Sequence, residues 1–470
     1  MKWLLTFLCL SIYSAAVYAV SSTGNRLLVV QEDETERDLF STFWADLESR
    51  GYKLTFESPK NTKLSLYHLG ARAYDHLILL PPKSKGAAWQ LRLGPSLTPK
   101  ALLDFVNDNG NILVALSGGA PTPNGVSSLL LELDIHLSPD RAPIVVDHFN
   151  YDTISSAEKH NVLLLPRPER LRPDTKPFFN GEGILALPNV AGQSLGNNSP
   201  LLAPIIRAPA TAYSYDKRDD DQSIDQKLPT GSQLALATAM QARNSARVTV
   251  LGSVDSLKDE WFNAKVQAPK GEKVETANKQ FAQQLTAWTF QETGVVKVTR
   301  VEHHLNEKGD IESGPKELNP SIYRIKNDVT FTIELSEYSY DQWIPYWTAE
   351  EDAIQLEFTM LSPFHRLNLQ PVDRTEHAAI YRTSFTLPDQ HGIFSFRVNY
   401  KRPFITNIEE KHEVTVRHFA HDEWPRNWSI SGGWVWIAGL WSVIGGFLAF
   451  VMVWLYSAPP MKSSDSKKEQ

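Results

Sequence analysis

Cysteine is almost absent from this 470-residue sequence. The single cysteine, Cys9, lies in an N-terminal segment that we expect to be cleaved after Ala19 as a signal peptide, so the mature chain has no thiol. This excludes disulfide bonds, thiolate zinc sites, redox CxxC chemistry and a cysteine nucleophile from the mature protein.

Several nucleotide-binding and hydrolase motifs are absent as well. The sequence has no GxGxxG, GxxxxGK[ST], GxSxG or HExxH pattern. Its formal net charge is -7 and its basic residues form no cluster, which argues against nucleic acid as a partner. With 42% hydrophobic and 21% charged residues, the composition is that of a globular protein with room for two or three domains.

Long hydrophobic runs are few, and each has a defined place. The first follows Lys2, spans residues 3–13 and is too short to cross a bilayer, so we interpret residues 1–19 as a secretory signal. The second, residues 434–456, has no charge over about 23 residues and carries tryptophan and tyrosine near its ends, as transmembrane helices do. The chain is therefore expected to be a single-pass type I membrane protein with a lumenal N-terminal region.

Residues 457–470 are then expected to form a short cytosolic tail. Lys467 and Lys468 occupy the fourth and third positions from the C-terminus. This arrangement resembles the dilysine address that returns type I proteins to the endoplasmic reticulum, which a receptor reads and which anchors nothing by itself. We therefore expect the protein in the endoplasmic reticulum membrane.

The apolar C-terminal run also carries small side chains at helical spacing. Ala438, Ser442 and Gly446 fall four residues apart, with Ala449 close to the same face. Small residues let helix backbones approach each other in lipid, so this face is predicted to pack against another transmembrane helix.

The region between these runs shows two patterns. Residues 20–292 alternate short apolar strands such as Arg26–Gln31, His76–Leu80 and Asn111–Ser117 with amphipathic helices, which predicts a parallel, Rossmann-like α/β sheet. Residues 293–420 change to a period of two, with six or seven strands separated by Pro, Gly and Asp turns. That pattern predicts an Ig-like β-sandwich next to the membrane.

Candidate chemical residues are sparse. Gly118 and Gly119 follow a predicted strand and could hold an anion, although a tight turn is the simpler interpretation. His303 and His304 have no third ligand at a fixed offset, so we interpret them as a solvent-exposed pair rather than a metal site.

Two further features concern single polar residues. Asp147–His148 is an acid/base pair in principle, but a lone Asp-His dipeptide is usually structural. Asn197 begins an Asn-Asn-Ser sequence followed by proline and is kept as a candidate glycosylation site, whereas Asn427 lies only about seven residues from the membrane, roughly 25 Å of extended chain, and is not expected to be modified.

Three stretches are specific enough to indicate a family. They are VVDHFNYD at residues 145–152, MQARNSARVTVLGSVDSLKDEWF at residues 240–262 and IQLEFTMLSPFHR at residues 354–366. Together with the C-terminal apolar run and the dilysine tail, they closely resemble the family of 48 kDa (beta) subunits of the eukaryotic oligosaccharyltransferase. The resemblance extends over nearly the whole mature chain.

The resemblance implies a non-catalytic subunit of the complex that transfers a preassembled oligosaccharide from dolichyl diphosphate to asparagine in Asn-X-Ser/Thr sequons. Catalytic residues and metal would belong to a multispanning partner subunit, with a ribophorin-type subunit as a further partner and with nascent chain and lipid-linked oligosaccharide contacted indirectly. It also implies an amidotransferase-like origin for the α/β region, without that fold's cysteine. No catalytic, cofactor-binding or metal-binding residue is assigned to this chain.

Two other classes of protein remain open at this stage. A lumenal carbohydrate-active enzyme would need paired carboxylates in a pocket, which a sequence alone does not place. A cargo or trafficking receptor would be expected to show a coiled coil or a forward-export tail, and the sequence shows neither.

Overall fold

The structure is a computed structural model. It describes residues 21–82, 96–120, 122–137, 143–167, 175–181, 183–196, 199–215, 229–306, 317–349, 351–424 and 433–457. The predicted signal peptide, Asn197 and the tail with Lys467 and Lys468 lie outside the described residues. By its internal contacts the chain divides into two compact units, one ending at Val416 and one beginning at Arg417.

The first unit begins with a nine-stranded mixed sheet. Five parallel strands form one half of the sheet in the order β2 (Lys53–Glu57), β1 (Arg26–Val30), β5 (His76–Leu79), β6 (Asn111–Ala115) and β15 (Arg247–Leu251). The other half is antiparallel and contains β14 (Leu234–Gln241), β11 (Gln193–Leu195), β7 (Ile135–His136) and β12 (Leu202–Arg207).

The prediction of a parallel sheet is therefore correct for five strands and wrong for the other four. β14 and β15 are adjacent both in sequence and in the sheet, and a short turn closes them into an antiparallel hairpin. Its backbone bonds run from Ala242 N–H to Ala246 O and from Ser245 N–H to Ala242 O. A parallel pair would have required a crossover of a dozen residues or more.

Helices cover both faces of the sheet. Alternate residues of β1 enter different cores: Leu27 and Val29 pack on one face, and Leu28 and Val30 on the other. This burial on both faces explains why the parallel strands read as continuous apolar runs. One face is covered by α3 (Pro99–Asn107) and α4 (Asn124–Glu132), and the other by α2 (Ser41–Ser49), α5 (Asp259–Phe262) and α6 (Asn278–Thr289).

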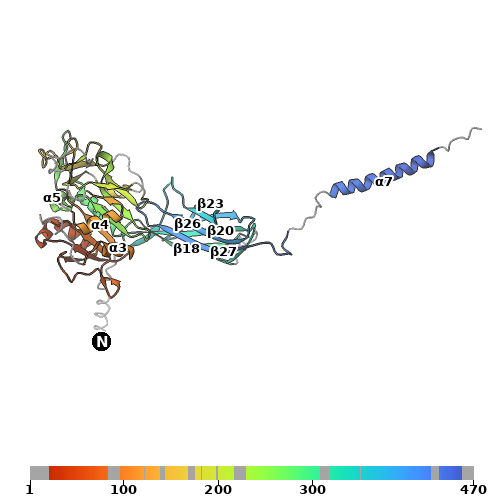
Figure 1. The fold of residues 1–470 in the computed structure, drawn as a ribbon, viewed down its shortest axis with the longest axis horizontal. Coiled ribbons are helices and arrows are strands. Elements are labelled where there is room, and N and C mark those ends of the chain that lie inside the picture. Colours follow the sequence, from red (N-terminus) through yellow and green to blue (C-terminus); the bar gives the residue numbers. More distant parts are fainter. Residues whose placement is uncertain are drawn as a thin grey trace, which may run out of the picture. The chain divides into compact units, whose positions relative to one another are not determined.

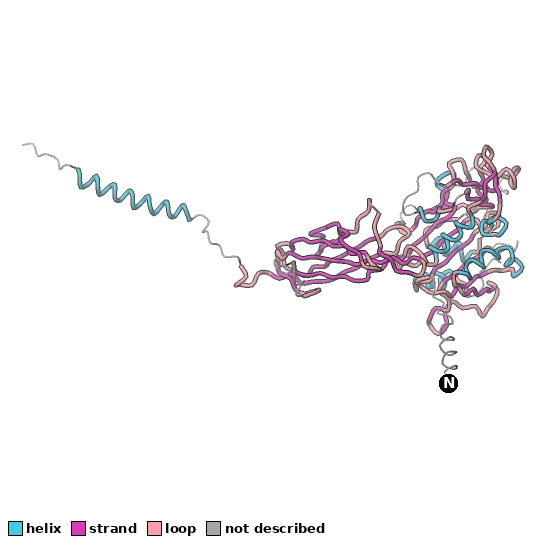
Figure 2. The backbone as a smooth tube through the Cα atoms, turned by 180° about the vertical axis from the view of Figure 1, so that it is seen from behind, coloured by secondary structure: helices cyan, strands magenta, loops and turns pink. Residues whose placement is uncertain are grey.

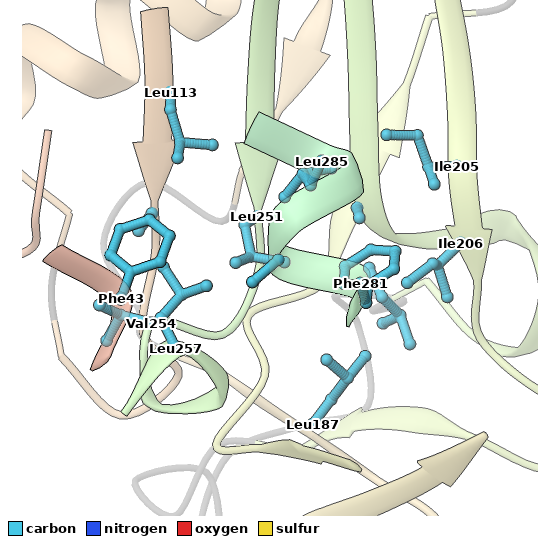
Figure 3. Packing of buried hydrophobic residues seen from close by; sticks show 14 of the residues in the cluster. Phe43, Leu113, Leu187, Ile205, Ile206, Leu251, Val254, Leu257, Phe281 and Leu285 are labelled. Atoms are coloured by element: carbon cyan, nitrogen blue, oxygen red, sulfur yellow. The ribbon is translucent and has the colours of Figure 1, made fainter. Parts of the chain in front are cut away.

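Figure 3 shows the second of these cores. Phe281 and Leu285 of α6 belong to the same buried cluster as Leu113 and Leu251 of the sheet and Phe43 of α2. All five are less than 5% exposed. Helices α6 and α2 therefore share one hydrophobic core on this face of the sheet.

Among the described residues of the α/β region, four two-stranded sheets and four 3-10 helices accompany the main sheet. The sheets pair β3 (Tyr67–His68) with β4 (Ala71–Arg72), β8 (Ile144–Val146) with β13 (Tyr213–Tyr215), β9 (Val162–Pro166) with β10 (Ile184–Pro188), and β16 (Lys265–Gln267) with β17 (Lys273–Glu275). The 3-10 helices are η1 (Glu34–Phe40), η3 (Lys176–Phe179), η4 (Gly231–Gln233) and η5 (Asp255–Leu257).

The chain then enters a β-rich region of two five-stranded sheets (Figure 1). One contains β18 (Val295–Leu305), β20 (Asp328–Ser339), β21 (Gln342–Pro345), β24 (Gln370–Arg374) and β25 (Ala379–Thr386). The other contains β19 (Ile322–Arg324), β22 (Gln355–Thr359), β23 (Pro363–Asn368), β26 (Gly392–Tyr400) and β27 (Ile408–Arg417). Phe331 of the first sheet stacks on Phe396 of the second with ring centroids 5.5 Å apart, so the two sheets share an aromatic core.

The second unit contains α7, which spans Gly433–Tyr456 (Figure 2). Among the described residues it is the one helix long and apolar enough to cross a membrane. The predicted helix over residues 434–456 is thus confirmed as a helix.

Candidate functional site

The first family-like stretch forms a loop held by two buried aspartates. The Asp147 carboxylate accepts from the backbone N–H of Phe149 at 2.8 Å, from Asn150 Nδ2 at 2.9 Å and from Thr211 Oγ1 at 2.7 Å. Asp152 accepts in the same way from three backbone N–H groups, of Ile154, Ser155 and Gln267. Both side chains are almost fully buried, so their role is to satisfy loop amides that water does not reach.

The same loop presents its other side chains outward. Phe149 is 70% exposed, and His148 is exposed beside it. His148 Nδ1 lies 2.5 Å from His160 Nδ1, and its Nε2 lies 2.9 Å from the Tyr213 hydroxyl. These rings form an aromatic and imidazole surface, which we call the His148 surface.

The His148 surface lies on the carboxyl side of the main sheet. Val145 of β8 donates its N–H to Val190 O, and Gly118, which follows β6, donates to the neighbouring carbonyl of Asn189. Ala191 donates to Gly252, which follows β15. In open α/β sheets, ligands bind outside the carboxyl ends of the parallel strands, which makes this side the first place to look for a site.

The geometry does not support acid/base chemistry by Asp147 and His148. The structure gives Asp147 no contact with the His148 ring, and its two oxygens accept from loop N–H groups and from Thr211. A general base needs a carboxylate or imidazole whose lone pair is free to take a proton. The dipeptide is structural, as its sequence context indicated.

Gly118 and Gly119 form a tight turn. A Cβ atom at Gly118 would lie 2.8 Å from Val190 O, so the close approach of two backbones requires glycine there. Gly119 has a φ of 82°, in the left-handed region that glycine adopts without strain. Because the Gly118 N–H is already bonded to Asn189 O, it does not serve an anion.

The second family-like stretch contains a fully buried arginine at the opposite, amino side of the sheet. Arg247, the first residue of β15, donates from Nη1 to Trp288 O at 2.6 Å and to Thr293 O at 2.7 Å, and from Nη2 to Gly294 O at 2.6 Å. Its guanidinium also lies 4.7 Å from the Trp288 ring centroid. Arg247 thus binds the chain where α6 gives way to the β-rich region, although burial lowers its pKa.

Phe404 seals this junction from the β-rich region. Its carbonyl accepts from Trp288 Nε1 at 2.8 Å, and its ring packs against Trp288 and Phe178. A second buried pair lies close by, where Glu292 accepts from Arg50 at 2.8 Å and from the Tyr52 hydroxyl at 2.7 Å. These residues could not be identified from the sequence. The one indication was that Arg247, a charged residue, stands at the start of the apolar run of residues 246–251.

His303 and His304 do not form a solvent-exposed pair. His303 is 3% exposed, its Nδ1 lies 2.7 Å from the Tyr323 hydroxyl, and its ring stacks on Phe396. His304 is only partly exposed on the other side of the strand, as strand geometry requires. Burial, with the nearby His412 and His304, lowers the pKa of His303 to about 4, so this histidine is a neutral core residue.

The third family-like stretch, residues 354–366, forms the hairpin of β22 and β23. Phe358 is fully buried and stacks parallel to Phe394 at 4.7 Å. This stretch therefore builds the core of the β-rich region, apart from its turn.

The β-rich region also carries a cavity of about 550 Å³ lined by Lys297, Trp343, Asp341 and Glu376, among others. The Lys297 ammonium lies 3.5 Å from the Trp343 ring centroid. The Glu376 side chain is 88% exposed and so lacks the apolar surroundings of a catalytic acid. Across the described residues, no group of three or more His, Cys, Asp or Glu side chains is arranged to hold a metal ion.

The structure describes Ala438, Ser442, Gly446 and Ala449 as parts of α7, and their role in packing stays a prediction. Ser442 donates its hydroxyl to Gly439 O at 2.8 Å, one turn back in the same helix. A hydroxyl bonded in this way lets a serine face apolar surroundings.

The comparison with known families decides the identity. The family model described as "OST48, N-terminal domain" matches residues 18–292, and the family model described as "OST48 middle domain" matches residues 303–458. The chain belongs to the OST48 family.

Relatives in this family match over almost their whole length. Subunit wbp1 of the dolichyl-diphosphooligosaccharide–protein glycosyltransferase of Schizosaccharomyces pombe is 34% identical over 92% of both chains. Subunit WBP1 of Saccharomyces cerevisiae is 30% identical over 97% of this chain and 96% of its own. The 48 kDa subunit of Danio rerio is 32% identical over 97% of both chains.

Among solved structures, a glutamine amidotransferase of Thermotoga maritima covers 49% of this OST48 chain and 75% of its own length. Its TM-score is 0.27 at 10% identity. A likeness of this size carries no argument about fold or chemistry.

Proposed function

We propose that this chain is a non-catalytic subunit of the oligosaccharyltransferase complex, which transfers a preassembled oligosaccharide from dolichyl diphosphate to asparagine in sequons of nascent proteins. The observation that carries the proposal is family membership over nearly the whole chain, with relatives that are named as subunits of this glycosyltransferase. The subunit would serve complex assembly, stability and full activity.

Catalysis is assigned to a different, multispanning subunit. In the described part of this chain, the buried polar groups with the most contacts already have structural partners: Asp147 and Asp152 bind loop amides, Arg247 binds carbonyls, and Glu292 binds Arg50. One apolar helix also offers no enclosed cavity for a polyprenyl lipid. A ribophorin-type subunit and the multispanning subunit are proposed as direct partners.

The proposed topology is that of a single-pass type I protein of the endoplasmic reticulum membrane. The signal peptide would occupy residues 1–19, the lumenal part residues 20–420 and the cytosolic tail residues 457–470. Lys467 and Lys468 would return the protein to the endoplasmic reticulum, and Asn197 remains a candidate glycosylation site.

The small face of α7 is proposed to pack against a transmembrane helix of a partner. Ala438, Ser442, Gly446 and Ala449 recur at about one helical turn, and their small side chains would let a second helix backbone approach closely. The face is therefore open to a close backbone contact.

We also propose a finer fold assignment. The order β2-β1-β5-β6 of parallel strands, with helices on both faces, supports a Rossmann-like, amidotransferase-like origin for residues 20–292. Two antiparallel sheets sharing an aromatic core support an Ig-like sandwich for residues 293–420.

Affinity purification of the tagged full-length chain in mild detergent tests the proposal. We expect stoichiometric recovery of the multispanning transferase, and loss of sequon-peptide glycosylation after depletion of the chain. Recovery of the chain alone, with glycosylation intact after depletion, would overturn the subunit role.

The α7 face is tested in the same purification. Gly446→Leu should release the partner subunits, whereas Leu448→Ala, on a different face of the same helix, should retain them. Equal recovery with both variants would show that this face is not the packing face.

A further inference from the structure

The β-rich region has one end that is not joined to the α/β region. This side carries Asp328 at the start of β20, which pairs with Thr386, and Gly392 at the start of β26, which pairs with Val416 near the end of β27. The opposite end carries Val295 and Thr406, which adjoin Arg247 and Gly294. We call the first side the free end.

Exposed aliphatic side chains gather at the free end. Leu361, in the turn between β22 and β23, is 99% exposed. Ile393 of β26 is 67% exposed, and Ile322 at the start of β19 is 57% exposed. Single exposed aliphatic residues are common on protein surfaces, but several at one end of a domain mark an interaction site.

These side chains lie on neighbouring strands. Ile393 pairs with Thr415 of β27, and Thr415 donates its N–H to Ser321, the residue before Ile322. The turn with Leu361 is adjacent too, because the Met360 sulfur would lie 2.7 Å from a Cβ at Gly392. The exposed apolar groups therefore lie on adjacent strands and turns at the free end, and we call them together the apolar patch.

The turn at the tip of this patch, Met360–Ser362, is uncharged. Lys326, in the turn before β20, forms an ion pair with Asp389 at 2.8 Å. A neutral, protruding apolar tip suits the boundary between lipid headgroups and acyl chains.

The chain leaves the β-rich region at this end. β27 ends at Arg417, and only residues 418–432 separate it from Gly433, the first residue of α7. At roughly 3.3–3.6 Å per extended residue, this segment spans at most about 50 Å. It includes Trp424, which is 58% exposed and contacts Phe419, and exposed tryptophan is typical of membrane interfaces.

We propose that the free end of the β-rich region rests on the bilayer surface, with the side chain of Leu361 inserted among the lipids. The inference depends on the proposed function in one respect, namely that α7 spans the membrane. A lipid surface is favoured over a protein partner because three exposed aliphatic side chains offer only part of the roughly 800 Å² that each side of a stable protein interface buries.

The absence of cysteine from the mature chain makes a direct test possible. Chains with Cys9→Ser and one of Leu361→Cys, Leu69→Cys or Leu448→Cys would each carry one thiol for an environment-sensitive fluorophore, whether or not residues 1–19 are removed. Leu69 is 95% exposed in the α/β region and serves as the aqueous control, and Leu448 of α7 reports insertion of the helix. Each labelled chain is reconstituted in phosphatidylcholine nanodiscs, with and without lipids that are spin-labelled near the headgroup.

We expect the label at Leu361 to emit at shorter wavelength than the label at Leu69, and to lose emission when spin-labelled lipid is present. Quenching at Leu448 but not at Leu361 would overturn the proposal and leave the membrane span intact. Quenching at neither position would remove the span itself. A blue shift at Leu361 that appears only with partner subunits, without lipid quenching, would assign the patch to a protein and also overturn the proposal.

Discussion

The amino and carboxyl sides of the main sheet use buried charge for opposite purposes. At the amino side, Arg247 binds three carbonyls from the segment that leads into the β-rich region, so its charge joins two regions. At the carboxyl side, Asp147 and Asp152 bind amides of their own loop, and each accepts one further bond from a distant segment, from Thr211 and from Gln267 respectively. Their charge therefore fixes one surface loop onto its neighbours. These three buried charged groups therefore hold backbone segments in place. The side chains that the Asp147–Asp152 loop turns outward, on the His148 surface, are the ones exposed to a binding partner.

The largest expected effect is at the amino side. Arg247→Met would remove three charge-assisted hydrogen bonds and the contact with the Trp288 ring, and should lower the free energy of unfolding by about 3–5 kcal/mol. Trp288 O and Gly294 O would keep their bonds from the N–H groups of Gln291 and Thr406. The α/β and β-rich regions should then unfold in separate steps during urea titration of the full-length chain. Arg397→Met, which removes an exposed arginine 3.4 Å from Glu409, is the matched control and should cost less than about 1 kcal/mol.

A smaller effect is expected at the carboxyl side. Asp147→Asn places an amide NH₂ against loop donors and should cost about 1–3 kcal/mol, with the loss confined to the loop. Hydrogen exchange should show faster exchange for Phe149 and Asn150 and no change at the junction. Asp373→Asn, on an exposed strand, is the control; faster exchange at Arg247 in the Asp147 variant would contradict the separation of the two sides.

His303 extends the comparison to the β-rich region through pH. Its pKa is lowered to about 4 in the folded chain against 6.5 for the unfolded chain, so the unfolded state binds the extra proton between these values. The neutral His303 side chain makes its full contribution to the free energy of unfolding above pH 6.5, and this contribution is lost as the pH falls toward 4. At pH 5 the loss amounts to about 2 kcal/mol.

His303→Phe should therefore give a shallower fall in unfolding free energy between pH 7 and pH 5 than the parent chain. His304→Phe, which alters the partly exposed neighbour, should retain the parent slope. Equal slopes for the His303 variant and the parent would show that His303 does not titrate in this window.

The smallest effect is expected on the His148 surface. Phe149 is 70% exposed, so Phe149→Ser should change the unfolding free energy by less than about 0.5 kcal/mol. Phe178→Ser, a buried phenylalanine in contact with Phe404, should by contrast cost several kilocalories per mole. Thermal unfolding of the two variants in the same detergent measures the difference.

The parts of the fold that local pattern controls could be predicted from the sequence. Apolar runs such as Asn111–Ser117 predicted buried parallel strands. The change to a period of two predicted the β-rich region, and the uncharged run at residues 434–456 predicted α7. The antiparallel half of the main sheet could not be predicted, because strands such as β7 and β11 have only two or three residues and their pairing depends on distant partners.

The candidate sites show the same limit. Strand geometry placed His303 and His304 on opposite sides, yet it did not tell which side was the core. The partners of Arg247 lie more than 40 residues away, so no spacing rule brings them together. Asp147 was correctly interpreted as structural, although only the structure identified its donors.

The place of β15 in the sheet has a consequence for biosynthesis. β6 ends at Ala115 and pairs directly with β15, which begins at Arg247. At about 5–20 residues per second, a translating ribosome needs roughly 7–26 seconds to supply that neighbour. Throughout this interval the edge of β6 that pairs with β15 has no final partner. We therefore expect nascent chains of this length to depend on chaperones, and truncations before Arg247 to be retained with them and degraded.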